Sequence, residues 1–288
     1  MVYLGQQLCR RANNPLAGFE SMDYKKARFD KLMTNIDKIL AEAQFLAATK
    51  SVKNILTVRN DAKTIKGEKY GVLTGVVYLA PANVSGYEMC PGRTPGCTAA
   101  CLYTAGHGAM SNVQRGRIRR TLQFVLRRDE FMAQLVKEIA SVVELSVKED
   151  MFPAIRLNGT SDVAYEDIPV TRDGVAYQHI FAAFQDVQFY DYTKVYTRLE
   201  AITKIPNYHV TFSLAETEVS RRGAIIALDL GFSVAAVFEE LPERFMGHEV
   251  IDGDETDVRF WDGSDGPVVV GLLPKGRAKK DKSGFVIR

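Results

Sequence analysis

The chain has 288 residues, of which 46% are hydrophobic and 25% are charged. This is the composition of a globular protein with a core of its own, and it excludes a disordered chain, a collagen and a coiled coil. The formal net charge of +2 requires neither a nucleic-acid nor a membrane partner. No apolar run approaches the roughly 18 residues that span a bilayer. Residues 1–5 do not begin a secretory signal either, so we expect a cytoplasmic protein with no membrane partner.

Residues 1–69 are predicted to form an N-terminal arm with one helix. Residues 1–21 show no periodicity, whereas apolar side chains recur at helical spacing through residues 23–48. Residues 52–69 are mixed in character and rich in lysine, and we interpret them as a solvated connector.

Short apolar runs alternate with helical stretches from residue 70 onward, which is typical of a parallel sheet built from βα units. We therefore expect an α/β fold over residues 70–276, a partial or open βα barrel with mainly parallel strands. The N-terminal helical arm precedes this domain, and the domain ends in a short β-rich segment. Residues 277–288 follow as a flexible basic tail. The expected strands are 72–80, 154–157, 189–192, 209–214, 233–238, 249–252, 258–261 and 268–272, and the expected helices are 112–147 with a break near residue 128, part of 175–186, one from about 193, and 217–230.

Three of the four cysteines lie in one short stretch directly after the first buried strand. Cys90, Cys97 and Cys101 have the spacing C-x6-C-x3-C, in a loop that is rich in glycine and proline. Structural cysteines have no reason to gather in such a loop, whereas thiolates that share a metal must converge on one point. The loop therefore predicts a metal site.

The number and spacing of these cysteines favour a [4Fe–4S] cluster. Three thiolates leave one iron of the cluster free for water, a substrate or a fourth ligand, for which Cys9 and His107 are candidates. A closed zinc site prefers four ligands in closely spaced pairs, which the six-residue gap does not provide. Zinc completed by Cys9 or His107, and the absence of any metal, remain open as alternatives.

Polar residues follow each predicted strand, and the carboxyl ends of parallel strands meet at one face of the sheet, where binding sites form. We therefore expect a small-molecule ligand there. The candidate catalytic residues are Lys194, Glu216 and Asp162, and the candidate cofactor-binding residues are Asn158, Ser161, Ser213, Tyr192 and Glu239.

Each of these residues also has a structural interpretation. Asn158, Ser161 and Asp162 could hold the amine or hydroxyls of a ligand, or form an Asx turn that caps a helix. Lys194 could act as a base, a Schiff-base former or a phosphate partner, or be a solvated lysine. Glu216 could face the ligand or lie in the first turn of a helix.

Basic residues are concentrated in one helix and in the tail. Several arginines of residues 112–128 would share one helix face, where they could bind nucleic-acid phosphates or form a solvated, salt-bridged surface. The acidic stretch 252–257 could bind a divalent metal, but it is better explained as a polar hairpin turn. The candidate nucleic-acid contacts are Arg115, Arg117, Arg119 and Arg120, together with the basic tail.

A metal loop after the first barrel strand, with polar strand ends around it, resembles the architecture of radical S-adenosylmethionine enzymes. In those enzymes a cluster with one open iron binds the methionine end of S-adenosylmethionine. The resemblance is topological, since that family has the spacing C-x3-C-x2-C and a Gly-Gly-Glu motif that this chain lacks.

A second resemblance is carried by a set of residues spread along the chain: Leu79 to Pro81, Cys90, Cys97, Cys101, Arg117 to Thr121, Arg156 to Asp162, Phe189 to Lys194, Ser213, Glu216, Asp252 to Asp254, Asp257 and Arg259. In these residues the chain resembles the mycobacteriophage gene-eighty-eight-product family and its relatives in phages and plasmids, over about residues 70–276. This resemblance implies a phage or mobile-element origin, hence the cytoplasm of a host cell, and it implies no defined activity.

Two functions are consistent with these observations. The first is an iron–sulfur enzyme, radical-SAM-like or acting by Lewis-acid chemistry on a small molecule bound at the strand ends. The second is a nucleic-acid-binding phage protein in which the metal only stabilises the loop. Polar residues at consecutive strand ends favour the enzyme, because a binding module does not need them there.

Overall fold

The computed structural model describes residues 40–41, 43–44, 46, 50–59, 62–263 and 265–288. The chain divides into two units, residues 1–44 and residues 45–288, and the described strands all belong to the second. The expected arm over residues 1–21, most of the expected helix over residues 23–48, and Cys9 lie outside the described residues.

A ten-stranded sheet forms the centre of the second unit, in the order β1-β2-β3-β6-β7-β8-β11-β10-β9, with β12 paired to β8. The pairs β1–β2 and β9–β10 are antiparallel and the other pairs are parallel. The expected α/β fold with a mainly parallel sheet is confirmed, and its closure into a partial or open barrel stays a prediction. The strands are β1 Leu56–Val58, β2 Val72–Val77, β3 Phe152–Arg156, β6 Gln188–Thr193, β7 Tyr208–Ser213, β8 Val234–Phe238, β9 Arg244–Phe245, β10 His248–Asp252, β11 Val269–Leu272 and β12 Val286–Ile287.

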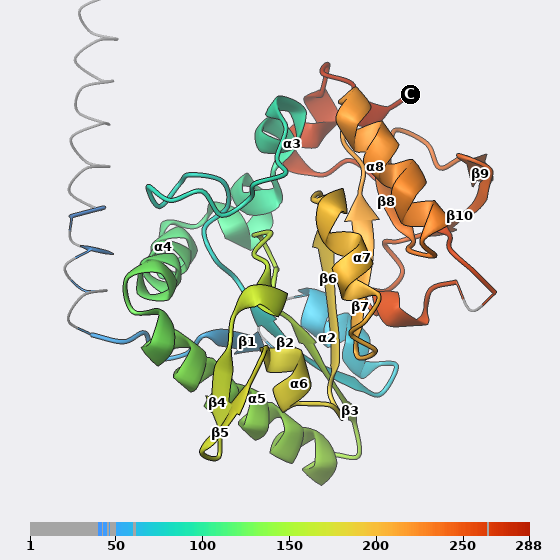
Figure 1. Cartoon of the computed structure of the whole chain (residues 1–288). Coiled ribbons are helices and arrows are strands. Elements are labelled where there is room, and N and C mark those ends of the chain that lie inside the picture. Colours follow the sequence, from blue (N-terminus) through green and yellow to red (C-terminus); the bar gives the residue numbers. More distant parts are fainter. Residues whose placement is uncertain (1–39, 42, 45, 47–49, 60–61, 264) are drawn as a thin grey trace, which may run out of the picture. The chain divides into compact units, whose positions relative to one another are not determined.

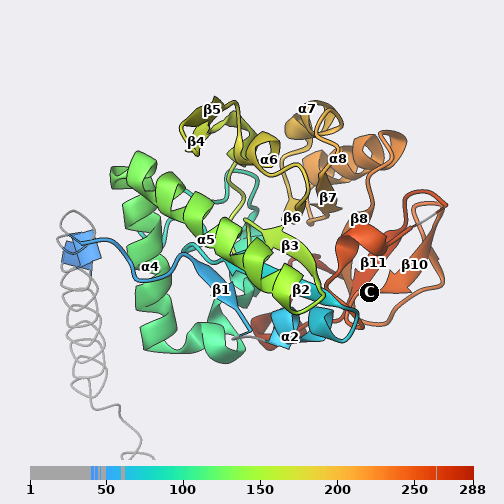
Figure 2. The same cartoon turned by 90° about the horizontal axis from the view of Figure 1, so that it is seen from below.

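Two long helices follow the cysteine loop, as the apolar periodicity predicts. Helices α4 (Ser111–Leu126) and α5 (Arg128–Lys148) are separated at Arg127, whose φ of −138° and ψ of 56° are not helical. The Phe124 and Phe131 rings meet across this break, edge to face, with centroids 5.2 Å apart. Figure 2 shows α5 lying across β2 and β3, and its buried residues contribute to the main core. The predicted break near residue 128 is therefore confirmed.

The helices between the later strands are short, apart from α8 (Glu218–Asp229). Thr217 caps α8 by accepting a hydrogen bond from Ser220 N, and Gly231, with a φ of 87°, lies just past its end. Helix α6 (Ile180–Ala183) falls within the stretch where part of a helix is expected. Helix α7 (Leu199–Ile202) begins six residues later than predicted, after a 3₁₀ turn at Tyr196–Arg198.

Two predictions about the local structure are wrong, and one hairpin was missed. The solvated connector instead contains β1 and helix α2 (Ala62–Glu68), and the Glu138 carboxylate of α5 accepts hydrogen bonds from Ile55 N and Leu56 N. The expected strand over residues 258–261 is a 3₁₀ turn, Arg259–Trp261. The hairpin of β4 (Val170–Arg172) and β5 (Val175–Tyr177) was not expected.

The C-terminal residues, expected as a flexible arm, instead pack onto the domain. Residues Gly276–Lys280 form a 3₁₀ helix that contacts α3 (Pro95–Ala100), and β12 pairs with the end of β8. Figure 1 shows this segment beside α3. The Asp281 carboxylate accepts hydrogen bonds from Ser283 N, Gly284 N and Val286 N, which holds the turn before β12. The sheet therefore begins before residue 70, with β1, and it includes β12 after residue 276. Both strands lie outside the predicted domain 70–276.

In the described residues, none of the helices is both long enough and apolar enough to span a bilayer.

Candidate functional site

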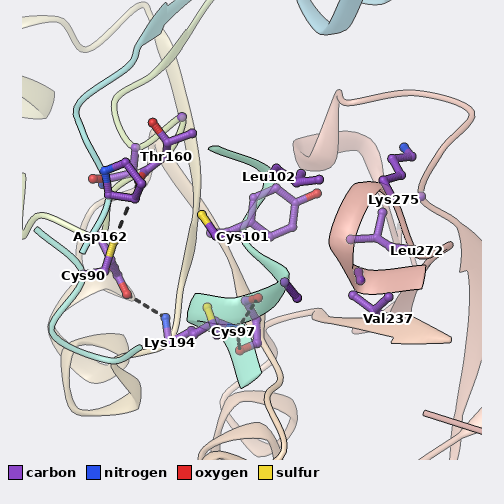
Figure 3. Close-up of a pocket in the computed structure, with 18 of the residues that line it drawn as sticks. Cys90, Cys97, Cys101, Leu102, Thr160, Asp162, Lys194, Val237, Leu272 and Lys275 are labelled. Atoms are coloured by element: carbon purple, nitrogen blue, oxygen red, sulfur yellow. Dashed lines mark hydrogen bonds between the residues drawn. The ribbon is translucent and has the colours of Figure 1, made fainter. Parts of the chain in front are cut away.

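A pocket of about 400 Å³ opens at the carboxyl ends of the parallel strands. Its wall is formed by residues in the last residues of, or just after, β2, β3, β6, β7, β8, β10 and β11, and by α3 and the C-terminal segment. Figure 3 shows Cys90, Asp162 and Lys194 on one side of the view, Val237 and Leu272 on the other, and Cys97, Cys101 and Leu102 between them. The predicted site residues that line it are Cys90, Cys97, Cys101, Asn158, Ser161, Asp162, Tyr192, Lys194 and Ser213.

Cys97 lies in the short helix α3, and Cys101 directly follows this helix. Thr94 caps this helix, since its hydroxyl accepts a hydrogen bond from Cys97 N at 3.1 Å, and Pro95 opens the first turn. The Glu216 carboxylate accepts hydrogen bonds from Gly96 N and Thr94 Oγ1, each at 2.7 Å. Glu216, predicted as a catalytic acid, therefore lies outside the pocket lining and anchors the start of α3.

The three cysteines are thiols rather than members of a disulfide, and each is partly exposed. Cys90 Sγ accepts a hydrogen bond from Ala82 N at 3.3 Å and donates to Thr160 O at 3.8 Å. Burial raises the pKa of the Cys90 thiol to about 12 and also raises the pKa of Cys101. Among the side chains that the structure describes, no three of the Cys, His, Asp and Glu type are grouped as ligands of a single metal ion. His107 is exposed and lies outside the pocket lining.

The turn after β3 is held by its own hydrogen bonds. Asn158 Oδ1 accepts from Ser161 Oγ at 2.9 Å and from Val163 N at 2.8 Å. Asn158 Nδ2 donates to Val163 O at 3.1 Å and to Asp191 Oδ2 at 3.2 Å. The side-chain amide thus already has two donated and two accepted bonds, which is the Asx-turn arrangement rather than a free ligand-binding group.

Asp162 joins the end of β3 to the end of β6. Its carboxylate accepts hydrogen bonds from Thr193 Oγ1 and Lys194 N and forms an ion pair with Arg198, all at 2.8 Å. Burial nevertheless raises the pKa of Asp162 above its ordinary value. These three contacts hold the loops at the ends of β3 and β6 together. Asp162 could act as a general base only after losing one of them.

Lys194 extends along the pocket wall from the end of β6. Its ammonium donates to Ser213 O and Ser213 Oγ at 2.9 Å and to Leu214 O at 3.2 Å, at the end of the neighbouring strand β7. Burial lowers the pKa of Lys194. Glu239, in contrast, is exposed, forms an ion pair with Arg288 at 3.1 Å, and lies outside the pocket lining.

The cysteine loop touches the backbone of Lys194 through Gly92. A Cβ at position 92 would lie 2.8 Å from Lys194 Cβ and 2.9 Å from its carbonyl carbon. We expect Gly92→Ala to lower the free energy of unfolding by about 1–3 kcal/mol in urea titrations, because a backbone neighbour cannot rotate away. Gly116→Ala is the control, since its nearest neighbour is an arginine Nη1 at 3.8 Å. Equal stability of the two variants would contradict this close approach.

A buried ion pair at the pocket was not predicted. Arg156 Nη1 and Asp257 Oδ2 are 2.9 Å apart, with 6% and 12% of the two side chains exposed, and both residues line the pocket. The Arg156 guanidinium also lies 4.9 Å from the centroid of the Tyr192 ring. The sequence does contain a signal for this pair, because Arg156 is the single charged residue of an otherwise apolar strand. A buried arginine is rarely left without a carboxylate partner.

Two of the four arginines expected to bind nucleic acid, Arg117 and Arg120, have partners within the fold. Arg117 is buried, 4.9 Å from the Tyr78 ring centroid and 5.6 Å from that of Tyr103. Arg120 Nε donates to Asn54 O at 3.0 Å. Arg115 is exposed and Arg119 is partly exposed. Only these two of the four arginines are therefore left for the predicted phosphate-binding face. Nucleic-acid binding stays a prediction.

These features define an α/β protein with a mainly parallel sheet and a cysteine-lined pocket at the carboxyl ends of its strands. The model of the family Gene product 88 matches residues 48–288, and the chain belongs to this family. No curated protein and no solved structure matches the chain.

Proposed function

We propose that this protein is an iron–sulfur enzyme of phage type, in which Cys90, Cys97 and Cys101 hold a [4Fe–4S] cluster beside a small-molecule site. The observation that carries the proposal is that these three sulfur-bearing residues line the same pocket as the strand-end residues. The pocket volume falls within the range of pockets that enclose small ligands, roughly 300–1,000 Å³.

The hydrogen bonding of the pocket supports a role for the sulfurs. The polar groups of Asn158, Asp162 and Lys194 are already hydrogen-bonded to backbone groups or to the side chains of neighbouring residues. Thiol sulfur retains strong bonding capacity for soft metals, and Fe–S clusters in proteins are held by cysteine thiolates. The residues present therefore suit a cluster by the chemistry of their donor set.

A single zinc ion fits this arrangement less well. Tetrahedral zinc needs thiolates about 3.8 Å apart, from Zn–S bonds of about 2.3 Å. The six-residue gap between Cys90 and Cys97 does not provide the closely spaced pair of ligands that zinc sites prefer. A cluster spreads its ligands over a wider core and accepts three cysteines from one loop and one short helix. With three cysteine ligands it offers an open iron as a Lewis-acid position for a substrate or for S-adenosylmethionine.

The rest of the molecule has a supporting role in this proposal. The partial or open barrel provides the frame, and the host cytoplasm provides the reducing conditions under which thiols persist. Tyr192 and Ser213 line the ligand space. Glu216 holds the start of the helix that carries Cys97, and Asp162 holds the backbone of Lys194 at the end of β6. Nucleic-acid binding is the weaker alternative, because Arg117 and Arg120 are already engaged.

Anaerobic purification with iron and sulfide analysis tests the proposal. We expect about four iron and four sulfide per chain, the composition of one [4Fe–4S] cluster, and almost none in the triple variant Cys90→Ala/Cys97→Ala/Cys101→Ala. Cys9→Ala should keep its iron if the fourth iron is open, as proposed, and should lose iron if Cys9 is the fourth ligand. A colourless zinc protein, or unchanged iron in the triple variant, would overturn the assignment. Consumption of S-adenosylmethionine by the reduced protein separates the radical-SAM-like form from the Lewis-acid form.

A further inference from the structure

Arg156 brings a buried positive charge to the wall of the pocket. It is the last residue of β3, only 5% of it is exposed, and it lines the pocket. Its guanidinium lies 4.9 Å from the centroid of the Tyr192 ring, and its Nη1 donates a hydrogen bond to Asp257 Oδ2 at 2.9 Å. Because an arginine side chain is not deprotonated in proteins, this positive charge is permanent.

The hydrogen bonding of this guanidinium is incomplete. Arginine carries N–H donors on each of its side-chain nitrogens. Asp257 accepts from Nη1, whereas Nε of Arg156 is buried without a partner among the described residues. Buried donors in folded proteins are nearly always paired, so a buried guanidinium with unmatched donors needs acceptors from outside the chain. Since Arg156 lines the pocket, a molecule bound there is the source of those acceptors.

The charged side chains next to Arg156 leave one positive charge in excess. Asp254 and Asp257 both line this part of the pocket. Lys66 Nζ donates to Asp254 O, and Lys275 forms an ion pair with the Asp254 carboxylate. Lys66, Lys275 and Arg156 thus place three positive charges against the two carboxylates of Asp254 and Asp257. A ligand with a negatively charged group neutralises this excess.

Apolar side chains form another part of the same wall. Val237, Leu272 and Phe285 line the pocket, and Figure 3 shows Val237 and Leu272 on the same side of the view as Lys275. Pockets for small molecules combine such apolar surface with a few polar groups that fix the orientation of the ligand. An apolar part of the ligand would be removed from water against these side chains while its charged part reaches Arg156.

We propose that the pocket binds a small amphipathic acid. The anionic oxygens of its carboxylate or phosphate accept hydrogen bonds from Arg156, and its apolar part lies against Val237, Leu272 and Phe285. Asp257 holds the guanidinium in place, and a fixed guanidinium suits both anions because it binds them through parallel N–H···O bonds. The inference deepens the proposed function, since it rests on the small-molecule site and names the class of its ligand.

Calorimetric titrations of the full chain with three probes test this class of ligand. Phenylacetate, phenyl phosphate and the neutral benzyl alcohol share one aromatic ring and differ in the polar group. We expect at least one of the anions to bind roughly tenfold more tightly than the alcohol, the usual effect of a hydrogen bond to a charged group. The tighter of the two anions distinguishes a carboxylate ligand from a phosphate ligand. Equal dissociation constants for the three probes, or binding of none of them, would overturn the inference.

A double variant tests the role of Arg156. Arg156→Met/Asp257→Leu removes the guanidinium without changing the net charge, and we expect it to bind the anions no more tightly than the alcohol. Arg222→Met/Glu218→Leu is the control, because it removes an exposed ion pair outside the pocket lining and should keep the preference. If circular dichroism shows the first variant to be unfolded, Arg156→Lys replaces it, since it keeps the buried charge and loses the parallel donors. An anion preference equal to that of the wild type in the folded Arg156 variant contradicts the assignment.

The triple variant Cys90→Ala/Cys97→Ala/Cys101→Ala separates this inference from the cluster. We expect it to retain the anion preference, because Arg156 is not a cluster ligand. Loss of the preference in this variant would place the anion on the iron and exclude the role of Arg156. Absence of iron from the wild type would overturn the cluster alone, and the anion preference would still decide the class of the ligand.

Discussion

Asp257→Ala is expected to lower the free energy of unfolding by about 3–5 kcal/mol, because it leaves the Arg156 guanidinium buried without its carboxylate. Only 6% of the Arg156 side chain is exposed, so water cannot replace the lost partner. The pair joins the last residue of β3 to the segment after β10, and both residues line the pocket. Chemical denaturation followed by tryptophan fluorescence and circular dichroism measures the change.

Two further variants separate the effect of an unpaired charge from a general loss of packing. The double variant Arg156→Met/Asp257→Leu replaces the pair with apolar side chains and should recover most of the stability, since no buried charge remains. Glu218→Ala removes an exposed partner of Arg222, whose ion pair spans 3.8 Å at the surface, and should cost less than about 1 kcal/mol. The interpretation is wrong if Asp257→Ala is no more destabilising than Glu218→Ala.

The elements that the sequence predicted correctly are those whose signal is local. The run Val72–Val77 is buried at every position, as its apolar and β-branched residues predict for a strand inside the sheet. The break between α4 and α5 and the capping residues of α8 also depend on near neighbours. Each of these features is fixed by residues fewer than about ten positions apart, within the reach of periodicity and capping rules.

The elements that were missed depend on partners far along the chain. Strand β1 is stabilised by the Glu138 carboxylate, which is 82 residues away from Leu56. Strand β12 has only two residues and exists because the end of β8 offers a free edge to Val286 and Ile287. The local sequence of the lysine-rich stretch 52–69 and of the basic tail therefore could not predict β1 or β12.

The same distinction applies to the site. The gathering of Cys90, Cys97 and Cys101 in one pocket follows from their proximity in the sequence. The role of Asn158 does not, because it is set by Asp191, 33 residues further on. Likewise Arg156 meets Asp257 across 101 residues. Sequence patterns therefore found residues that share the pocket, whereas the residues that hold them in place required the fold.

The buried carboxyl group of Asp191 makes stability depend on pH in a defined direction. Asp191 is 1% exposed, and burial raises its pKa to about 7 although Asn158 N donates to it at 2.7 Å. In the unfolded chain the same group has a pKa of about 3.9. Between these two values the unfolded state is ionised while the folded state stays neutral. This group's contribution is thus fully present below about pH 4 and is lost as the pH rises through 7, by about 4 kcal/mol in total.

Asp191→Asn removes this titration while keeping the shape of the side chain. His209 acts in the opposite direction over the same range, because burial, helped by Arg259, lowers its pKa to about 4, so its contribution is lost as the pH falls. The quantity to measure is therefore the difference in unfolding free energy between wild type and variant, from urea titrations at several pH values from 4 to 8, in which His209 cancels. We expect the wild type to lose stability relative to Asp191→Asn across this range. A difference that stays constant with pH would mean that Asp191 is ionised in the folded protein, held by Asn158 and Tyr208 as a buried carboxylate.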